Sequence, residues 1–212
     1  MEIKNIIDIS PQISPRLAVF PGDKVFERNI SLDMHHGDIL TLSSINTTLH
    51  LGAHADAPSH YHKKGASIEH RKLEAYLGPC QVIQVQNLKK KKRIYPKDIE
   101  DVSIQAPRVL LSTSSYEPEL WNDDFNSLSP GLIEYLHKKK VILVGIDTPS
   151  VDPSDSKTLE SHQALAKFDL SVLEGLVLQH VPPGLYFLSA LPLKLEGADA
   201  SPVRAVLFSV KS

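Results

Sequence analysis

The sequence contains a single cysteine, Cys80, among its 212 residues. One cysteine cannot form an internal disulfide bond, and it cannot supply the several thiolates that a typical structural zinc site needs. Cys80 lies before an alternating apolar segment, so we interpret it as a buried, inert thiol. Any metal ion bound by this chain would therefore be held by imidazole and carboxylate groups.

Excess charge of one sign and aromatic side chains are also scarce. The 23 Lys and Arg residues are offset by 25 Asp and Glu residues, which leaves a net charge of −2, and aromatic residues make up 6% of the chain. This composition argues against a basic field or a base-stacking surface that would attract nucleic acid or an anionic membrane. We interpret the basic run at residues 89–93 as a solvated loop. A small-molecule substrate is the expected partner.

Long hydrophobic runs are missing as well. No apolar stretch approaches the ~20 residues needed to cross a bilayer, and the first residues lack the basic and apolar regions of a secretion signal. We therefore expect a cytoplasmic protein.

The sequence also lacks a Gly-x-Ser-x-Gly motif and a glycine-rich phosphate loop, which argues against a serine hydrolase and a nucleotide-binding protein.

Strand-like and helix-like patterns follow one another without strict alternation. Strands are expected over residues 3–9, 39–49, 81–86, 108–113, 141–146 and 203–210, and helices over residues 68–77, 96–102, 130–140 and 159–167. This mixture predicts an α/β fold in which helices flank a mixed sheet. The length predicts a single domain that spans residues 1–212.

Histidine is unevenly distributed, because five of the ten histidines fall within one segment of 21 residues. His50, His54, Asp56 and His60 are separated by gaps of 4, 2 and 4 residues. In an extended chain these even gaps place all four side chains on one face, whereas a helix would turn Asp56 away from the first two histidines. Fully extended, His50 and His54 would lie about 13 Å apart, too far to share one ion. We therefore expect the chain to bend at Gly52.

Two imidazoles and one carboxylate suit Zn²⁺ or another divalent transition metal better than calcium or magnesium. Such an ion lowers the pKa of water and generates a hydroxide nucleophile near neutral pH. His60 can then act as a proton shuttle, because the ordinary pKa of histidine lies near working pH. His62 and His70 carry no such ligand pattern and are interpreted as solvent-facing. The alternative is a histidine-rich surface loop without an ion, which the even spacing and the small intervening residues disfavour.

The segment from His50 to His60 reads His-x-Gly-x-His-x-Asp-x-Pro-x-His, and it resembles the cyclase family of metal-dependent hydrolases. The resemblance runs nearly end to end and is closest to the bacterial-type kynurenine formamidase branch. Its other matching segments are residues 8–10, 21–23, 76–79, 145–150, 152–153, 156–158, 173–175, 190–194 and 199–207. The resemblance implies a swivelling β/β/α fold and hydrolysis of N-formyl-L-kynurenine to L-kynurenine and formate in tryptophan degradation.

The resemblance also implies a site with two divalent metal ions per chain, zinc first and manganese as the alternative. His50, His54 and Asp56 would hold one ion, with Asp56 bridging to the second. His162 and Glu174 would complete the second, and Glu174 would contact both. Without the resemblance, His162 reads as an ordinary helix-surface histidine. Glu174 stands in an apolar run, where a buried carboxylate needs a partner such as a cation.

One position departs from the family pattern. Tryptophan precedes the Pro-Gly-Asp segment in the family and packs against the aromatic substrate, whereas this chain has Phe20. Phenylalanine keeps an apolar ring but loses area and the indole N–H. Phe20 is therefore the expected ring-facing wall, and substrate preference follows less directly from the sequence than the metal chemistry does. The only tryptophan, Trp121, is interpreted as a packing residue, with a role in the pocket as the alternative.

Two alternative functions stay open at this point. A related metal-dependent hydrolase of another aryl or cyclic amide, such as isatin, would carry the same motif. An inactive metal-binding homologue would also keep the ligands, but His60, which matches the general acid/base of the family, argues against it. A homo-oligomer, either a dimer or a tetramer, is expected because sites of this kind often lie near subunit contacts.

Overall fold

The computed structural model describes residues 2–85 and 93–211. The basic run at residues 89–93 therefore lies outside the described residues except for Arg93, and so does the end of the strand expected over residues 81–86. Within the described ranges, no helix is both long enough and apolar enough to cross a membrane.

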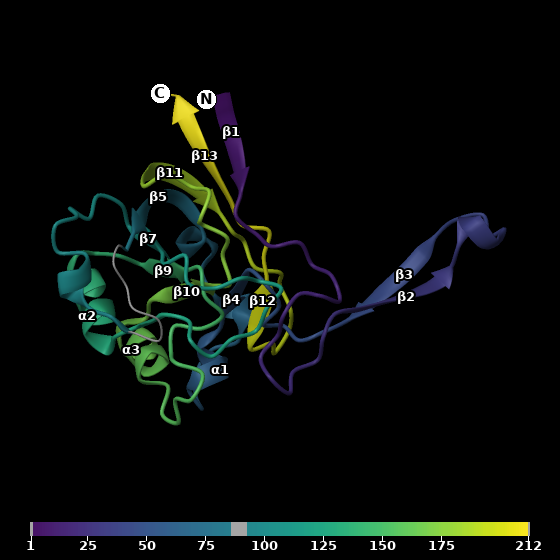
Figure 1. Ribbon diagram of the computed structural model, residues 1–212, viewed down its shortest axis with the longest axis horizontal. Coiled ribbons are helices and arrows are strands. Elements are labelled where there is room, and N and C mark those ends of the chain that lie inside the picture. Colours follow the sequence, from purple (N-terminus) through teal and green to yellow (C-terminus); the bar gives the residue numbers. More distant parts are fainter. Residues whose placement is uncertain (1, 86–92, 212) are drawn as a thin grey trace.

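A mixed sheet runs through the centre of the fold and confirms the expected α/β class (Figure 1). In the described part of the chain its nine strands lie in the order β1 (Glu2–Asp8), β13 (Val206–Lys211), β11 (Gly184–Ser189), β5 (Leu77–Gln84), β7 (Arg108–Ser112), β9 (Leu143–Ile146), β10 (Ser171–Glu174), β4 (His54–Asp56) and β12 (Ala200–Pro202). Strands β5, β7, β9 and β10 pair in parallel, and the strands on either side of them pair antiparallel. A second small sheet pairs β6 (Arg93–Ile94) with β8 (Ser127–Leu128).

Buried apolar side chains form a cluster on each face of the parallel strands. Helices α2 (Pro130–Lys138) and α3 (Glu160–Phe168) contribute to one cluster, which also contains Val109 of β7. The neighbouring Leu110 belongs to the other cluster together with Cys80, as expected for successive residues of a strand. Cys80 is buried, as predicted, and burial raises the pKa of its thiol to about 12.

The histidine motif bends instead of running straight. Gly52 adopts a φ of +57°, which is the left-handed conformation that permits the expected bend. The chain then forms the short strand β4, which holds His54 and Asp56 between β10 and β12. His60 lies beyond this strand on α1 (Pro58–Tyr61), a single helical turn with proline at its start. The extended conformation predicted for all four motif residues is therefore wrong for His60.

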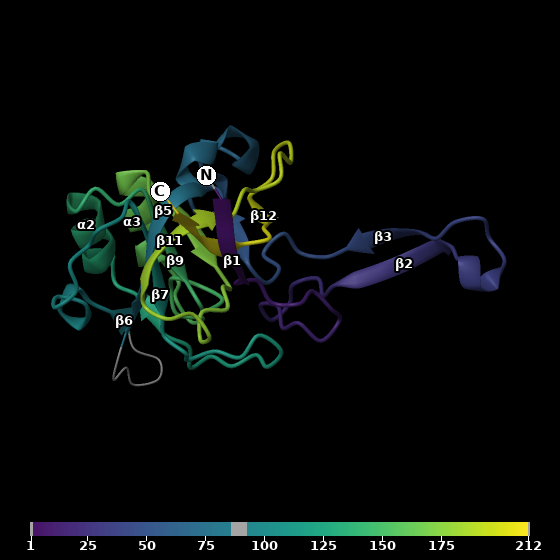
Figure 2. The same cartoon turned by 90° about the horizontal axis from the view of Figure 1, so that it is seen from above.

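A β-hairpin projects away from the body of the protein (Figures 1 and 2). It consists of β2 (Glu27–Leu32) and β3 (Leu42–Asn46), which are connected through a 3₁₀ turn at Met34–His36. We call residues 25–46 the arm. Strand β3 falls within the strand predicted over residues 39–49, whereas the sequence patterns do not predict β2. Every residue of both strands is exposed, so neither strand has the buried face that sequence patterns of strands reveal.

Two of the predicted helices, over residues 68–77 and 96–102, are wrong in extent. They are replaced by short 3₁₀ turns at Ile68–His70, Leu73–Ala75 and Pro96–Asp98. In the first case the guanidinium of Arg108 donates to the backbone carbonyls of Glu74 and Ala75. The break itself comes earlier, where Arg71 and Lys72 adopt an extended backbone between the two turns. Arg108 caps the last carbonyls before the chain enters β5.

Candidate metal centre

A cavity of about 410 Å³ lies beside the ends of strands β4 and β10. Six of the seven residues selected from the sequence line it, namely Phe20, His50, His54, His60, His162 and Glu174. The seventh, Asp56, is 1% exposed and lies against three of these histidines. The fold thus brings together residues that are up to 154 positions apart in the sequence, from Phe20 to Glu174.

The pairing of β4 with β10 sets both carboxylates beside the histidines. Glu174 ends β10 and lies opposite His54 in the sheet register. His54 Nε2 is 3.4 Å from Glu174 Oε2 and 3.3 Å from Asp56 Oδ1. His50 Nδ1 reaches the same Asp56 oxygen at 3.0 Å. Two imidazole nitrogens therefore converge on one carboxylate oxygen, as ligands of a common ion would.

Two glycines allow the backbone to come this close. Gly52 and Gly175 both have left-handed φ angles, of +57° and +64°. A side chain on Gly175 would overlap the backbone carbonyl of Gly52. The turn after Glu174 can therefore pack directly against the bend before His54 only because Gly175 carries no Cβ atom, whereas a Cβ atom on Gly52 would meet Pro11 and Leu17.

Helix α3 brings His162 to the other side of the carboxylates. His162 Nε2 lies 3.3 Å from Asp56 Oδ2 and 3.5 Å from Glu174 Oε1. The same Glu174 oxygen accepts a hydrogen bond of 2.7 Å from the backbone N–H of Val151. Asp56 and Glu174 each contact both His54 and His162, which is the arrangement that bridging carboxylates require.

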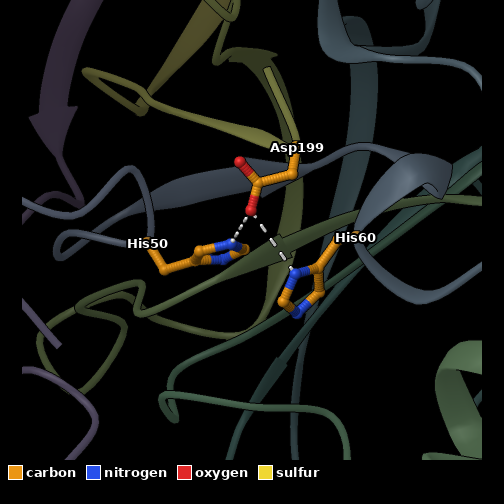
Figure 3. Close-up of side chains that lie close together, drawn as sticks. All are labelled: His50, His60 and Asp199. Carbon is orange, nitrogen blue, oxygen red and sulfur yellow. Dashed lines mark hydrogen bonds and ion pairs between the residues drawn. The ribbon is translucent and has the colours of Figure 1, made fainter. Parts of the chain in front are cut away.

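In His50, His54 and His162, the ring nitrogen that points away from the buried carboxylates already has a polar partner. His50 Nε2 lies 2.9 Å from Asp199 Oδ2 (Figure 3). His162 Nδ1 lies 2.8 Å from Asp152 Oδ2, and His54 Nδ1 lies 2.8 Å from a backbone carbonyl two residues earlier. Outer partners of this kind fix the tautomer and orientation of metal-binding histidines. The remaining nitrogens are the ones that face the buried carboxylates.

Two buried atoms at the centre of this cluster make no hydrogen bond. His54 Nε2 and Asp56 Oδ1 are fully enclosed, and although they lie 3.3 Å apart their geometry is not that of a hydrogen bond. Buried polar atoms without a partner are costly, and a divalent cation would satisfy both. The ligand atoms of His50, His54 and Asp56 lie within 4.8 Å of one another. Imidazole and carboxylate donors at this spacing fit a transition-metal ion such as zinc.

The pKa values of the histidines and carboxylates in this cluster are shifted because several charged groups are buried together. Burial lowers the pKa of His54, but the close carboxylates of Asp56 and Glu174 favour the protonated ring, outweigh burial and raise that pKa to about 10. The pKa of His162 is raised in the same way by Asp152, Asp56 and Glu174. Histidine contacts hold the pKa of Asp56 well below its ordinary value in spite of burial. Without a metal ion, protonated histidines therefore balance the two carboxylates.

His60 differs from the other histidines because its side chain is 34% exposed. Its Nδ1 lies 3.6 Å from Asp199 Oδ2, the same oxygen that contacts His50 (Figure 3). Burial lowers the pKa of His60, so its ring is neutral at pH 7 and free to accept a proton. The ligand atoms of His60, Asp56 and His162 also lie within 4.8 Å of one another, which places His60 next to the cluster.

Two acidic residues of the site were not selected from the sequence. Asp152 accepts from the backbone N–H and lies against the ring of His162, and it also pairs with Arg93 at 2.9 Å. Asp199 lies between His50 and His60. Both residues stand in segments that carry the family resemblance, which is the one signal that could have indicated them. Of the other histidines in the motif region, His70 is exposed, as predicted, with 69% of its side chain accessible.

The chain belongs to the Cyclase family, whose model matches residues 7–153. The kynurenine formamidase of Bordetella petrii is 42% identical over 207 residues, which cover 97% of this chain and 98% of that protein. The kynurenine formamidase of Polaromonas naphthalenivorans is 45% identical over 203 residues, which cover 95% of this chain and 90% of that protein. A solved structure described as a potential metal-dependent hydrolase with cyclase activity matches with a TM-score of 0.84 and 29% identity, and covers 100% of both chains. These findings confirm the expected family and fold class.

The raised histidine pKa values predict how the stability of the chelator-treated protein depends on pH. A histidine with a raised pKa in the folded state stabilises that state below its ordinary pKa of 6.5, and this contribution is lost as pH rises towards about 10. We expect the free energy of unfolding, measured with urea in the presence of chelator, to fall by roughly 2 kcal/mol or more between pH 6.5 and pH 9.5. The pKa values of Asp56 and Glu174 are lowered in the folded state, so both carboxylates stabilise that state above their ordinary pKa values. This contribution to stability is lost as the pH falls below that range.

The metal-loaded protein serves as the control for this measurement. A bound ion replaces the protons on the histidines, so the fall towards alkaline pH is expected to disappear. A chelator-treated protein that is more stable at pH 9.5 than at pH 6.5 would contradict the assignment of protonated histidines to the cluster.

Proposed function

We propose that this protein is a metal-dependent amide hydrolase that converts N-formyl-L-kynurenine to L-kynurenine and formate. The observation that carries the proposal is the cluster of three histidines and two buried carboxylates beside a cavity that also exposes His60 and Phe20. The names of the relatives that match nearly the whole chain support the choice of substrate. Hydrolysis of an aryl amide needs groups that activate water and protonate the leaving nitrogen, together with an apolar wall for the ring. Candidates for all of these lie at one cavity.

We propose that the cluster holds two divalent ions, with zinc as the first choice and manganese as the second. His50, His54 and Asp56 would hold one ion, and His162 and Glu174 would complete the other. The contacts of Asp56 and Glu174 with both His54 and His162 support their role as shared ligands. When bound, the ions would polarise the formyl carbonyl and lower the pKa of the attacking water.

His60 is the residue that moves the proton in this mechanism. Its neutral ring accepts a proton from the attacking water and delivers it to the amide nitrogen as the C–N bond breaks. That nitrogen leaves as an aniline, which is weakly basic and therefore an easier leaving group than an alkyl amine. Asp199 lies 3.6 Å from His60 Nδ1 and would hold the ring so that Nε2 serves the reaction. Phe20, which is 46% exposed at the cavity, provides an apolar wall for the aromatic ring.

The direct test of this function is an assay with and without chelator. We expect the purified protein to bind two divalent ions per chain by elemental analysis and to hydrolyse N-formyl-L-kynurenine. Chelation should abolish hydrolysis, and added zinc or manganese should restore it. Isatin serves as the comparison substrate. Hydrolysis that survives complete removal of metal would contradict the mechanism, and a clear preference for isatin would contradict the assigned substrate.

Replacement of His60 tests the proton shuttle separately from metal binding. We expect His60→Ala to keep its metal content but to lose about 10²–10⁴-fold in kcat, which is the usual contribution of a general acid/base. His70→Ala is the matched control, because His70 belongs to the same segment but is exposed and lies outside the cavity lining. The control should match the wild type. A near-normal kcat in His60→Ala, with metal content unchanged, would show that another group carries the proton.

We also propose that the protein is a homo-oligomer in which the arm contacts a second copy. Ile30 pairs with Ser43 and Ile45 pairs with Arg28, so both isoleucines lie on one face of the hairpin. They are 50% and 65% exposed. The arm exposes further large apolar side chains, namely Val25, Leu32, Met34, Ile39, Leu40 and Leu42. A two-stranded hairpin is marginal in water by itself, and so many exposed large apolar side chains on one hairpin typically mark an interface.

Light scattering after size-exclusion chromatography tests the role of the arm. We expect the wild type to elute as a dimer or tetramer and the double variant Ile30→Asp with Ile45→Asp to elute as a monomer, because buried charges oppose association. The control is Asn29→Asp with Ser44→Asp, which adds the same charge on the opposite face of the same strands. A monomeric wild type, or an unchanged mass in the isoleucine variant, would rule out this interface.

A further inference from the structure

Two loops from distant parts of the sequence form one wall of the cavity. One loop follows β1 and carries Phe20, and the other follows β7 and carries Tyr116 and Trp121. The backbone N–H of Ala18 donates a 2.9 Å hydrogen bond to the carbonyl of Pro118, which ties the loops together. The wall is therefore a single unit and not two independent loops.

Aromatic rings fill the space between these loops. The rings of Phe20 and Trp121 are 5.2 Å apart in an edge-to-face arrangement. Behind them, Trp121 also packs edge-to-face against Tyr116 at 6.2 Å and Phe125 at 6.1 Å. Phe125 is 2% exposed, so it anchors the group in the protein interior. Phe20, Tyr116 and Trp121 line the cavity, and Trp121 is the only tryptophan of the chain.

The base of the second loop is held firmly by a buried carboxylate. Asp147 accepts hydrogen bonds from the backbone N–H groups of Thr113 and Ser114, both at distances of 2.8–2.9 Å. It also accepts from the hydroxyl of Thr113 at 2.6 Å and, more weakly, from that of Ser112 at 3.3 Å. Ser114 has a φ of +52°, an uncommon conformation that these bonds stabilise. Asp147 therefore fixes where the loop leaves β7.

We propose that Trp121, together with Phe20, is a specificity-determining residue for the aromatic part of the substrate. The inference rests on the proposed hydrolysis of an aryl formamide. The aniline ring would pack against the joint surface of Phe20 and Trp121 while the formyl group reaches the histidine cluster. Trp121 offers a larger ring face than phenylalanine alone, and aromatic pairs gain stabilisation beyond simple burial. Its indole N–H already lies 3.3 Å from Asp123 Oδ1, which orients the ring.

Steady-state kinetics with N-formyl-L-kynurenine test this inference. We expect Trp121→Ala to raise KM about tenfold while kcat stays within about twofold, because ring packing binds the substrate without taking part in the chemistry. Trp121→Phe keeps a ring and is expected to be intermediate. Leu120→Ala is the matched control, since Leu120 is the neighbouring residue, 62% exposed and outside the cavity lining. Its kinetics should equal those of the wild type.

A compensating variant separates ring packing from a general disturbance of the loop. Phe20→Trp combined with Trp121→Ala restores an indole from the other loop, so KM should return to within about threefold of the wild type. An unchanged KM in Trp121→Ala, an equal rise in Leu120→Ala, or a double variant as impaired as Trp121→Ala would each overturn the inference while leaving the proposed function standing. A metal-loaded wild type that does not hydrolyse N-formyl-L-kynurenine would instead overturn the proposed function, and the inference with it.

Discussion

Two buried carboxylates held side by side are the constraint on which the rest of this site depends. Asp56 is 1% exposed and Glu174 is 3% exposed, and each lies within 3.5 Å of both His54 and His162. Two adjacent anions in the protein interior are unfavourable unless positive charge is shared between them. Either protonated imidazoles or divalent cations can supply that charge. The pairing of β4 with β10 makes the arrangement unavoidable, because the register places Glu174 opposite His54.

The surrounding polar contacts keep this charged cluster rigid. Arg93 donates to Asp152 at 2.9 Å, and Asp152 in turn lies 2.8 Å from the ring of His162, so the cluster is connected to the surface through a chain of charges. On the other side, one oxygen of Asp199 contacts both His50 and His60. A proposed metal ligand and the proposed proton shuttle therefore share one carboxylate. Moving either ring would disturb the other, which favours a fixed distance between the proposed metal ligand and the proposed shuttle.

The sequence predicts the parts of the site that depend on local spacing. The pattern from His50 to His60 predicts the bend at Gly52 and the pairing of His54 with Asp56 on one strand, because these follow from side-chain periodicity and a single glycine. Only the family resemblance indicates His162 and Glu174. The packing of a helix brings His162 to the site and the register of the sheet brings Glu174, and local spacing reveals neither. Asp152 and Asp199 were missed for the same reason. The exposed strand β2 has no buried face for a pattern to reveal. The helix expected over residues 68–77 is broken at Arg71, whose backbone is extended and whose guanidinium bonds to Asp169 and Ser171, both remote in sequence.

Calorimetric titration of the chelator-treated protein with zinc at pH 7 tests the central claim most directly. Repeating the titration in buffers with different ionisation enthalpies counts both the ions bound and the protons released. We predict two ions per chain and the release of at least one proton per chain, because neighbouring carboxylates raise the pKa of His54 to about 10 and a ligand must lose its proton to bind metal. Zinc uptake without proton release, or the same uptake by Asp56→Asn, would contradict a metal centre at these carboxylates.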